Sequence, residues 1–450
     1  MRKFIVGVLL VGCFGINILN AQSKVLTFEE AVKIGLKNGV LLNQQRNNLQ
    51  YNEMQRISNW AGLGPTLSVS GQAIRIDGNT FNQNEAKVVN GLFDQVSGSI
   101  NAGINIFNGF AQVSRVRQST SLAEAQAFYI NRASQDIINT ISSQYLQVLL
   151  DNELLTIAKE SAIAQQKQLE QVKEQVSVGA KSPVDEYNQD SQAKAAEIKA
   201  LQAEINLIND KSLLSLTLLL DPTQVLEVVK PEWDLNKTNS DIDLNSLINL
   251  SLTRRGDYLR AVKNEEAAKY GMRSIRASLT PTLSAFGSLY SAYNHAHGDP
   301  TVRAFGTQFS TDNLKKYVGL QLSIPILGGQ QTLQNRANYV QQRVAYENSM
   351  LTKKNTEMQV KTDIVRAYQN YSLYAKTYSV SLDQLKAADL ALQFETERYN
   401  LGITNFVDYA NANKVFVQSQ TDKAQAEYKL LFQKVALDYA AGTLKIEDVQ

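Results

Sequence analysis

The chain has 450 residues, of which 44% are hydrophobic and 20% are charged, and 45 lysine and arginine residues nearly balance 43 aspartate and glutamate residues. This balance argues against a nucleic-acid-binding surface, which needs a basic patch, so we expect no nucleic-acid partner. Cys13 is the single cysteine, which excludes intrachain disulfides and thiolate metal sites.

Residues 1–21 have the features of a secretory signal peptide. Two basic residues precede an apolar stretch over residues 4–18, and no acidic residue occurs before Glu29. Cleavage after Ala21 competes with cleavage before Cys13, which would produce a lipidated cysteine. We favour Ala21 because the apolar stretch continues past Cys13. No later apolar run is long enough to predict a membrane-spanning helix.

Alternating polarity predicts two β-strands in the first half, at about residues 66–76 and 96–107. In the second of these, apolar residues at even positions alternate with serine, asparagine and glycine at odd positions. This pattern is typical of a strand with one apolar and one wet face, and its length suits an outer-membrane barrel strand. A polar loop is expected between the strands, at residues 78–94.

A long helical hairpin is predicted over about residues 111–219. Its first arm contains no proline and is rich in residues that favour helices. Gly179 suits the C-terminus of this arm, whereas Ser182 and Pro183 suit the N-cap and first position of the returning helix. A linker is expected at residues 220–245.

The second half of the chain repeats the first. The P-T-L-S segment at Pro65 returns at Pro281, and the tip segment at Val178 returns at Leu401. A unit of about 220 residues is too long for a solenoid repeat of 20–50 residues, so each half must build the same elements. We therefore assign residues 22–245 to a first repeat and 246–450 to a second, with strands at about 282–293 and 317–326 and a helical hairpin at about 330–441.

Apolar residues recur at seven-residue steps in the first arm of both hairpins. Such a stripe favours a partner helix packed alongside, in coiled-coil fashion. The first series is Ile141, Val148, Leu155, Ala162, Leu169 and Val176, and the second is Ile364, Tyr371, Tyr378, Leu385, Leu392 and Tyr399.

Four strands per chain cannot close a barrel, and an open strand edge is not tolerated in lipid. If the strands lie in a membrane, several chains must therefore share one barrel. Aromatic residues near the strand ends are candidates for the interfacial girdles of such a barrel. They are Phe93, Phe107, Tyr290, Tyr293 and Tyr317.

Together these motifs resemble the outer-membrane efflux proteins, the TolC family. The resemblance rests on the P-T-L-S strand entries, the I-P-I-L-G-G strand exit, the tip segments, the L-T-F-E-E-A opening and the final A-G-T-L. It implies a mainly α chain with a transmembrane β part, in which a homotrimer forms a shared 12-stranded β-barrel and an α-helical periplasmic tunnel.

The resemblance also implies the function and the partners. The implied function is a passive exit duct in the outer membrane, serving a tripartite efflux or type I secretion system. Its cargo would be small molecules or polypeptides, delivered by an inner-membrane pump through a periplasmic adaptor. No cofactor is implied.

The resemblance further assigns roles at the hairpin tips. The adaptor would dock on Val178, Gly179, Ala180, Leu401, Gly402 and Ile403. The periplasmic gate would comprise Asp185, Asp408, Tyr399, Asn411 and Thr404. Thr404 stands where a latching arginine can occur and Asn411 where a second aspartate can, so we expect closure to depend less on ion pairs and more on packing. The glycines also fit simple helix caps, and the aspartates fit favourable helix N-terminal charges.

Other function classes lack their residues. No phosphate-binding G-K-S or G-K-T loop and no G-x-S-x-G elbow occurs, so we expect no enzyme. His295 and His297 form a pair, but two ligands make a poor metal site, and we favour a solvated loop and no metal. A secreted coiled-coil structural or adhesive surface protein remains the alternative function.

Overall fold

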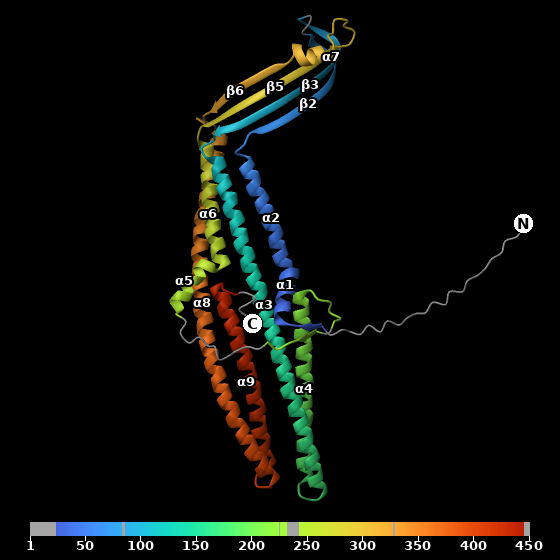
Figure 1. Cartoon of the computed structure of the whole chain (residues 1–450), viewed down its shortest axis with the longest axis vertical. Coiled ribbons are helices and arrows are strands. Elements are labelled where there is room, and N and C mark those ends of the chain that lie inside the picture. Colours follow the sequence, from blue (N-terminus) through green and yellow to red (C-terminus); the bar gives the residue numbers. More distant parts are fainter. Residues whose placement is uncertain (1–23, 83–85, 225, 232–242, 327–328, 445–450) are drawn as a thin grey trace, which may run out of the picture.

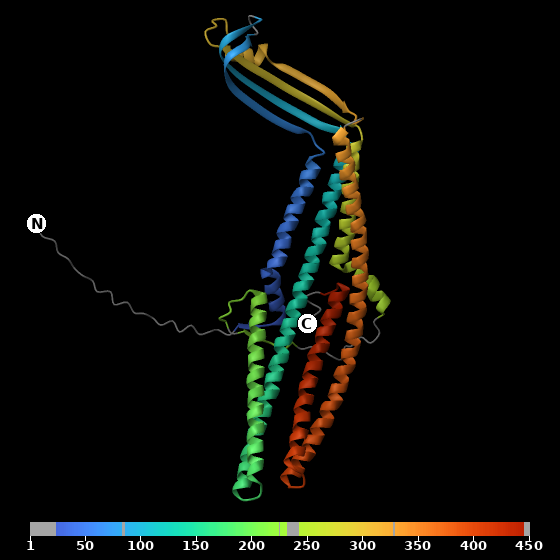
Figure 2. The same cartoon turned by 180° about the vertical axis from the view of Figure 1, so that it is seen from behind.

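A computed structural model describes residues 24–82, 86–224, 226–231, 243–326 and 329–444. The expected signal peptide, both cleavage sites and residues 232–242 of the expected linker lie outside these residues. The described chain is long and narrow, with a twisted sheet at one end and the tips of two helical hairpins at the other (Figure 1). The view from behind shows the same two-ended arrangement (Figure 2).

Four antiparallel strands form the sheet in the order β2–β3–β5–β6, so the two repeats meet at the β3–β5 pair. The strands are β2 (Thr66–Asn82), β3 (Lys87–Phe107), β5 (Thr282–Ala296) and β6 (Lys315–Ser323). The prediction of a polar loop at residues 78–94 is wrong, because the pairing of β2 with β3 continues up to Asn82, which lies opposite Lys87. Main-chain pairing continues there because ladder hydrogen bonds do not require apolar side chains.

The two faces of the sheet differ in polarity. On one face the cross-strand partners are apolar, as in Val69 opposite Ile100 and Ile100 opposite Leu289. Their side chains are exposed, with Val318 reaching 92%. On the other face, Ser70 lies 2.8 Å from Ser99 and the amide of Asn101 donates to Ser99 at 3.0 Å. The sheet therefore presents an apolar surface on one side and a hydrogen-bonded polar surface on the other.

The candidate girdle residues divide between these faces. Phe107 and Tyr293 lie on the apolar face, since they pair with Leu283 and Val96. Tyr290 pairs with Ser99 and Tyr317 with Ser288, which places both on the polar face together with Phe93. A girdle made from all five residues is therefore wrong, because side chains alternate between faces along a strand.

Beyond the end of β6, side-chain amides take the place of a strand at the edge of β5. Gln308 accepts from the main-chain N–H of Asn294 at 3.1 Å and donates to its carbonyl at 3.1 Å. Asn313 donates to the carbonyl of Ala292 at 2.7 Å. The segment that carries them includes the short helix α7 (Phe305–Thr307). These side chains bind main-chain N–H and C=O groups of β5 that would otherwise be unpaired at the edge of the sheet.

Two helices run the length of the helical part, α3 (Ala111–Ser177) and α8 (Gly329–Asn400). With 67 residues, α3 is about 100 Å long. Near the sheet these helices are accompanied by α2 (Val40–Ala61) and α6 (Gly256–Arg276), and toward the tips by α4 (Pro183–Leu218) and α9 (Phe406–Ala441). The helices α2 and α6 were not predicted from the sequence.

No helix in the described part of the chain has the combination of length and apolar character that a membrane-spanning helix requires.

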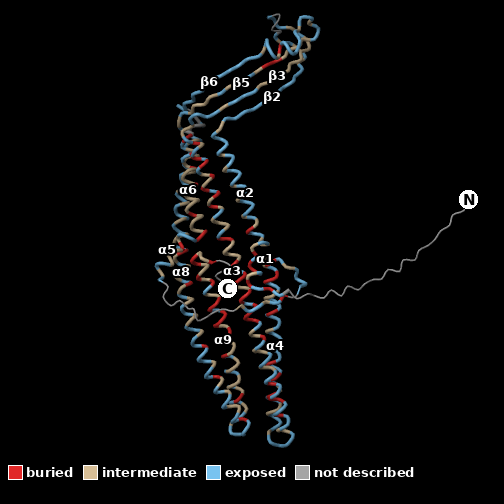
Figure 3. Tube along the Cα trace, in the orientation of Figure 1, coloured by how far each residue is buried: buried red, intermediate tan, exposed pale blue. Residues whose placement is uncertain are grey.

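The core lies along α3, where buried residues concentrate, whereas the sheet is mostly exposed (Figure 3). Tyr145 is fully buried, and its hydroxyl lies 2.7 Å from the carbonyl oxygen of Val229 and 2.9 Å from that of Leu26. These residues border the two-stranded parallel sheet of β1 (Lys24–Leu26) and β4 (Leu226–Val228). Burial raises the pKa of Tyr145 to about 12, which keeps it neutral.

Two carboxyl groups, of Asp151 on α3 and Asp210 on α4, lie close enough to interact electrostatically. Asp151 is 5% exposed, and its Oδ1 accepts from the amide of Gln147 at 3.0 Å. Burial, followed by the neighbouring carboxylate of Asp210, raises the pKa of Asp151 to about 7. The hairpin therefore contains an acid that favours its protonated form in the folded chain.

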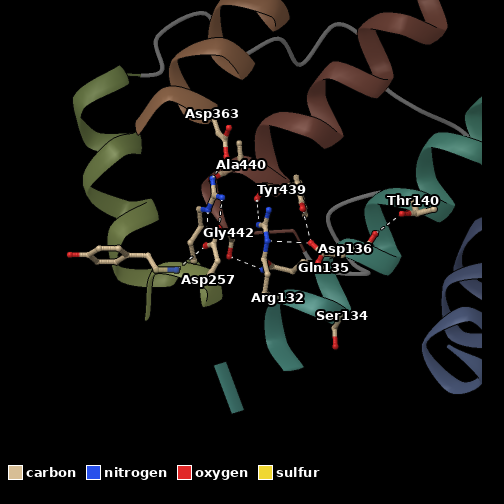
Figure 4. Close-up of polar contacts among 12 residues, drawn as sticks. Arg132, Ser134, Gln135, Asp136, Thr140, Asp257, Asp363, Tyr439, Ala440 and Gly442 are labelled. Atoms are coloured by element: carbon tan, nitrogen blue, oxygen red, sulfur yellow. Dashed lines mark hydrogen bonds and ion pairs between the residues drawn. The ribbon is translucent and has the colours of Figure 1, made fainter. Parts of the chain in front are cut away.

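The junction where α9 ends against α3 and α5 (Leu244–Arg254) is closed by polar and charged side chains (Figure 4). Arg132 donates to the carbonyl of Tyr439 at 3.3 Å, and its guanidinium lies 3.8 Å from the centre of that ring. Gln135 donates to the carbonyl of Gly442 at 3.1 Å. The last carbonyls of α9 are thus satisfied by side chains of a neighbouring helix, as a buried helix end requires.

Arg255 completes this junction from the N-terminus of α6. Its side chain is 3% exposed and binds Asp257 at 2.5 Å and Asp363 of α8 at 3.0 Å. It also lies 3.5 Å from the carbonyl of Ala440. Burial alone would raise the pKa of Asp257, but the hydrogen bonds and charge of Arg255 lower it below its ordinary value. One guanidinium therefore holds α6, α8 and α9 together.

Candidate functional site at the hairpin tips

Both long helices end in the same hydrogen-bonded turn. Gly179 has φ of +74° and Gly402 has φ of +70°, the left-handed region that favours glycine. In the first turn the N–H of Gly179 donates to Val176 at 2.9 Å and that of Ala180 donates to Gln175 at 2.8 Å. The second turn repeats both bonds, from Gly402 to Tyr399 and from Ile403 to Arg398. These are Schellman motifs, which satisfy the last carbonyls of a helix.

The returning helices are capped by side chains. Ser182 accepts from the N–H of Val184 at 3.3 Å, and Asn405 accepts from the N–H of Asp408 at 3.0 Å. The hydroxyl of Thr404 donates to the carboxylate of Asp408 at 3.0 Å. Asp408 is therefore engaged within its own tip, where its charge favours the helix N-terminus.

The residues expected to dock the adaptor form the outer end of the tips. Val178 is 78% exposed, Leu401 74% and Ile403 64%. A Cβ atom added to Gly179 or Gly402 would meet no atom within 4 Å. Within one chain, glycine is therefore required by the backbone conformation and not by lack of space.

Tyr399 lies at the centre of the contact between the two tips and is only 3% exposed. Its ring stacks on Tyr409 of α9 with centroids 5.1 Å apart, and it meets Phe406 edge-on at 6.3 Å. The Nζ of Lys181, from the tip of the other hairpin, lies 3.1 Å from the centre of the Tyr399 ring. A desolvated cation–π contact of this kind contributes about 2 kcal/mol.

Two glutamines extend this contact toward the sheet. Gln189 of α4 is fully buried and donates to Gln165 of α3, at 3.1 Å to the main-chain oxygen and 2.8 Å to the side-chain oxygen. The side chain of Gln165 also lies close enough to the hydroxyl of Tyr409 to lower its pKa, against the larger effect of burial. Residues from both hairpins thus form one cluster behind the tips.

Burial determines the electrostatics of this cluster. It raises the pKa of Tyr399 to about 12, and the charge of Asp185 acts in the same direction. Burial also lowers the pKa of Lys181, although Asp185 partly opposes this shift. Among the described residues, neither the hydroxyl of Tyr399 nor the Nζ of Lys181 has a hydrogen-bond partner. The cation–π contact is therefore the main interaction that holds the Lys181 ammonium.

The expected gate residues are only partly brought together within one chain. Tyr399 lies in the cluster and half-buried Asp185 beside it, whereas Asp408 and Asn411 are exposed. Lys181 was not predicted as a functional residue. The sequence could have indicated it, because alignment of the two tip segments places Lys181 opposite Thr404, the position where a latching cation was expected and is absent.

The histidine pair lies at the other end of the molecule. His297 binds Asp94 at 2.8 Å, and the rings of His295 and His297 are 4.9 Å apart. Within the described ranges, no group of three histidine, cysteine or acidic side chains is placed to hold a metal ion.

Residues 36–220 and 247–443 match the family model of the outer membrane efflux protein. The chain belongs to the outer membrane efflux protein family. The two matched segments correspond to the two halves of the chain, and the family resemblance inferred from the motifs is confirmed.

Individual relatives agree with this assignment. Over 327 residues the chain is 24% identical to outer membrane protein TolC of Escherichia coli (strain K12), a match covering 70% of this chain and 63% of that protein. Over 365 residues it is 21% identical to TolC of Vibrio cholerae, covering 79% of this chain and 78% of that protein. The chain thus matches less than two thirds of the length of the Escherichia coli relative.

Solved structures share the fold. The outer membrane protein VceC of Vibrio cholerae superposes with a TM-score of 0.80 at 15% identity, covering 92% of this chain and 96% of that one. The outer-membrane channel OprN superposes with a TM-score of 0.79 at 17% identity, covering 93% of this chain and 90% of that one. The predicted mainly α fold, with a duplicated unit of long helical hairpins and strands, is confirmed. The chain is an outer-membrane protein whose helical part extends into the periplasm.

Proposed function

We propose that the chain forms a passive exit duct as a homotrimer in the outer membrane. In this proposal a periplasmic adaptor and an inner-membrane pump deliver small molecules or polypeptides to the helical end, and the cargo leaves through the sheet end. The duct performs no chemistry of its own. The family assignment favours this function over a secreted adhesive protein.

The sheet is the observation that carries the proposal. Its outer strands, β2 and β6, each pair on one side only, and its apolar face is exposed. Lipid requires every main-chain group to be satisfied, so these edges must close on other copies. Three copies of four strands give a twelve-stranded barrel, with the apolar faces toward lipid and the polar faces toward a lumen.

The tip cluster supports a closed gate in this duct. Lys181 and Tyr399 come from different hairpins, so their contact holds the two tips of one chain together. In a trimer, Asp185 and Asp408 of the three copies would surround the narrow end, with Thr404 and Asn411 adjacent. Carboxylates gathered at a constriction favour cations. The gate then opens when the hairpins separate and Tyr399 leaves its contacts.

The exposed tips support the docking role. Val178, Leu401 and Ile403 expose apolar side chains. They belong to the hairpin tips, and these tips lie at the end of the molecule farthest from the sheet (Figure 1). Large exposed apolar groups at one end of a molecule indicate an interaction site. The Schellman turns fix the backbone of Gly179 and Gly402, which presents the neighbouring Ala180 and Ile403 in a defined geometry.

The decisive experiment measures single-channel conductance of the detergent-extracted chain in a planar bilayer, together with its oligomeric mass. We expect small, steady, cation-selective steps from a particle of three chains. A monomer or dimer that never conducts would contradict the duct and leave the long helices with a structural role.

A further inference from the structure

A basic groove lies where the helices meet the sheet. Figure 1 shows that α3 begins and α6 ends directly beneath the strands. Between them lies a groove of about 360 Å³, whose lining includes Phe110, Val113, Arg117, Tyr270, Arg273 and Arg276. It contains three arginines and no acidic residue.

The three arginines have no carboxylate partner in the part of the chain that the structure describes. All three are exposed, and the guanidinium groups of Arg117 and Arg273 lie 5.5 Å and 5.6 Å from the centre of the Tyr270 ring. Arginines elsewhere in the described chain, such as Arg132 and Arg255, bind acidic side chains. The groove is therefore a positively charged site with unused hydrogen-bond donors.

The groove continues the apolar face of the sheet. Phe107 pairs with Leu283 on that face, and its ring contacts Phe110 edge-on at 5.6 Å. Phe110 is 66% exposed and lies in the groove lining. Aromatic residues at this level suit the boundary between hydrocarbon and headgroups. The groove is therefore continuous with the apolar face of the sheet through Phe107 and Phe110.

With the sheet in a membrane, the arginines would lie close to the depth of the lipid headgroups. Arg117 follows Phe110 by seven residues, which is about 10 Å along α3. Side chains of a helix tilt toward its N-terminus, which for α3 is the sheet end, so Arg117 extends toward the membrane. The headgroup layer occupies roughly 5–8 Å beyond the hydrocarbon core. The guanidinium of Arg117 could therefore reach this layer, and Arg276 is the last residue of α6, shortly before β5 begins at Thr282.

Favourable interactions with helix dipoles do not account for the positions of all three arginines. Arg273 and Arg276 lie near the C-terminus of α6, where a cation is favoured. Arg117 lies in the second turn of α3, near the N-terminus, where a cation gains nothing from the dipole. The convergence of all three on one groove therefore indicates a shared ligand with negative charge.

We propose that this groove binds the phosphate of an anionic phospholipid from the periplasmic leaflet of the outer membrane. The guanidinium groups donate to the phosphate oxygens, a geometry that arginine matches well. The acyl chains lie along Phe107, Phe110 and the apolar face of the sheet. The proposal rests on the membrane position of the sheet and does not depend on conduction.

The test measures lipid binding to the detergent-extracted full chain by native mass spectrometry. Dioleoyl phosphatidylglycerol is compared with dioleoyl phosphatidylcholine, which has the same acyl chains and no net charge. One variant combines Arg117→Gln, Arg273→Gln and Arg276→Gln. The matched control removes three charges far from the membrane, by Lys173→Gln, Lys199→Gln and Arg254→Gln.

We expect the unmodified chain and the control to prefer phosphatidylglycerol about tenfold, and the arginine variant to lose that preference. A variant in which lysine replaces the same three arginines should retain part of the preference for phosphatidylglycerol. Because this variant keeps the positive charges, it distinguishes an effect of charge from a loss of the folded structure. Millimolar inorganic phosphate should not displace the lipid. Equal binding of both lipids by the unmodified chain, an unchanged preference in the arginine variant, or displacement by free phosphate would each overturn the proposal.

Discussion

Replacing Arg255 by methionine tests the junction between α6, α8 and α9. Methionine retains much of the length and apolar volume of arginine but removes the charge. It leaves Asp257 and Asp363 without their shared cation, although their side chains are 31% and 45% exposed. Breaking a fully buried ion pair destabilises by about 3–5 kcal/mol, and partial exposure of both acids reduces this to about 2–3 kcal/mol.

The assay is amide hydrogen exchange of the purified chain, followed peptide by peptide. A loss of about 2–3 kcal/mol raises exchange through local opening by about 30–150-fold. The increase should be confined to the first turn of α6, the last turn of α9 and the part of α8 around Asp363. Arg254→Met is the matched control, because Arg254 is the adjacent arginine and is exposed. Equal exchange in the two variants, or faster exchange throughout the chain, would refute the reasoning.

Four further predictions concern the gate and the hairpins. Lys181→Met should shift the open–closed ratio of the channel toward open by about 30-fold, the equivalent of about 2 kcal/mol; Lys173→Met, an exposed control on α3, should leave it unchanged. Asp408→Asn should lower the permeability ratio of cations to anions, and an unchanged ratio would remove Asp408 from the pore. Asp151→Asn should stabilise the chain by up to about 4 kcal/mol at pH 8 and little at pH 4, measured by thermal unfolding. Because the pKa of Asp151 is raised in the folded state, wild-type stability falls between pH 4 and pH 7; a pH-independent difference would contradict this. Leu401→Asp should abolish efflux in cells while conductance in bilayers persists, and loss of both would indicate misfolding.

The hairpins and their tips could be predicted from sequence because local chemistry determines them. Gly179 and Gly402 stop the long helices, and Ser182 and Asn405 start the next ones through hydrogen bonds to nearby N–H groups. These signals act over a few residues, so they can be read directly from the chain.

The helix α2 escaped prediction because few of its residues pack within the chain. In α2, Leu42 is the only residue of the helix that is buried within the chain, and Tyr51, Met54 and Trp60 are exposed. A helix that packs by a narrow contact on α3 carries little apolar periodicity. Its existence depends on tertiary packing that sequence alone does not display.

The contact between Lys181 and Tyr399 was missed for a related reason. The two residues belong to different repeats, and only the side-by-side arrangement of the hairpins brings them together. The position at which a latching cation was expected is Thr404, within the second tip. The structure supplies the cation from the equivalent position of the first tip instead.

The short strand β6 limits how tall a closed barrel can be. It has nine residues, whereas β2 has 17, and Gln308 and Asn313 occupy the edge of β5 above it. A neighbouring copy can therefore pair with β2 along only about half its length. In a trimer the upper parts of β2, β3 and β5 of each copy would extend beyond the closed wall as three separate sheets. The mouth of the duct would then have three gaps between these sheets, through which cargo could leave sideways.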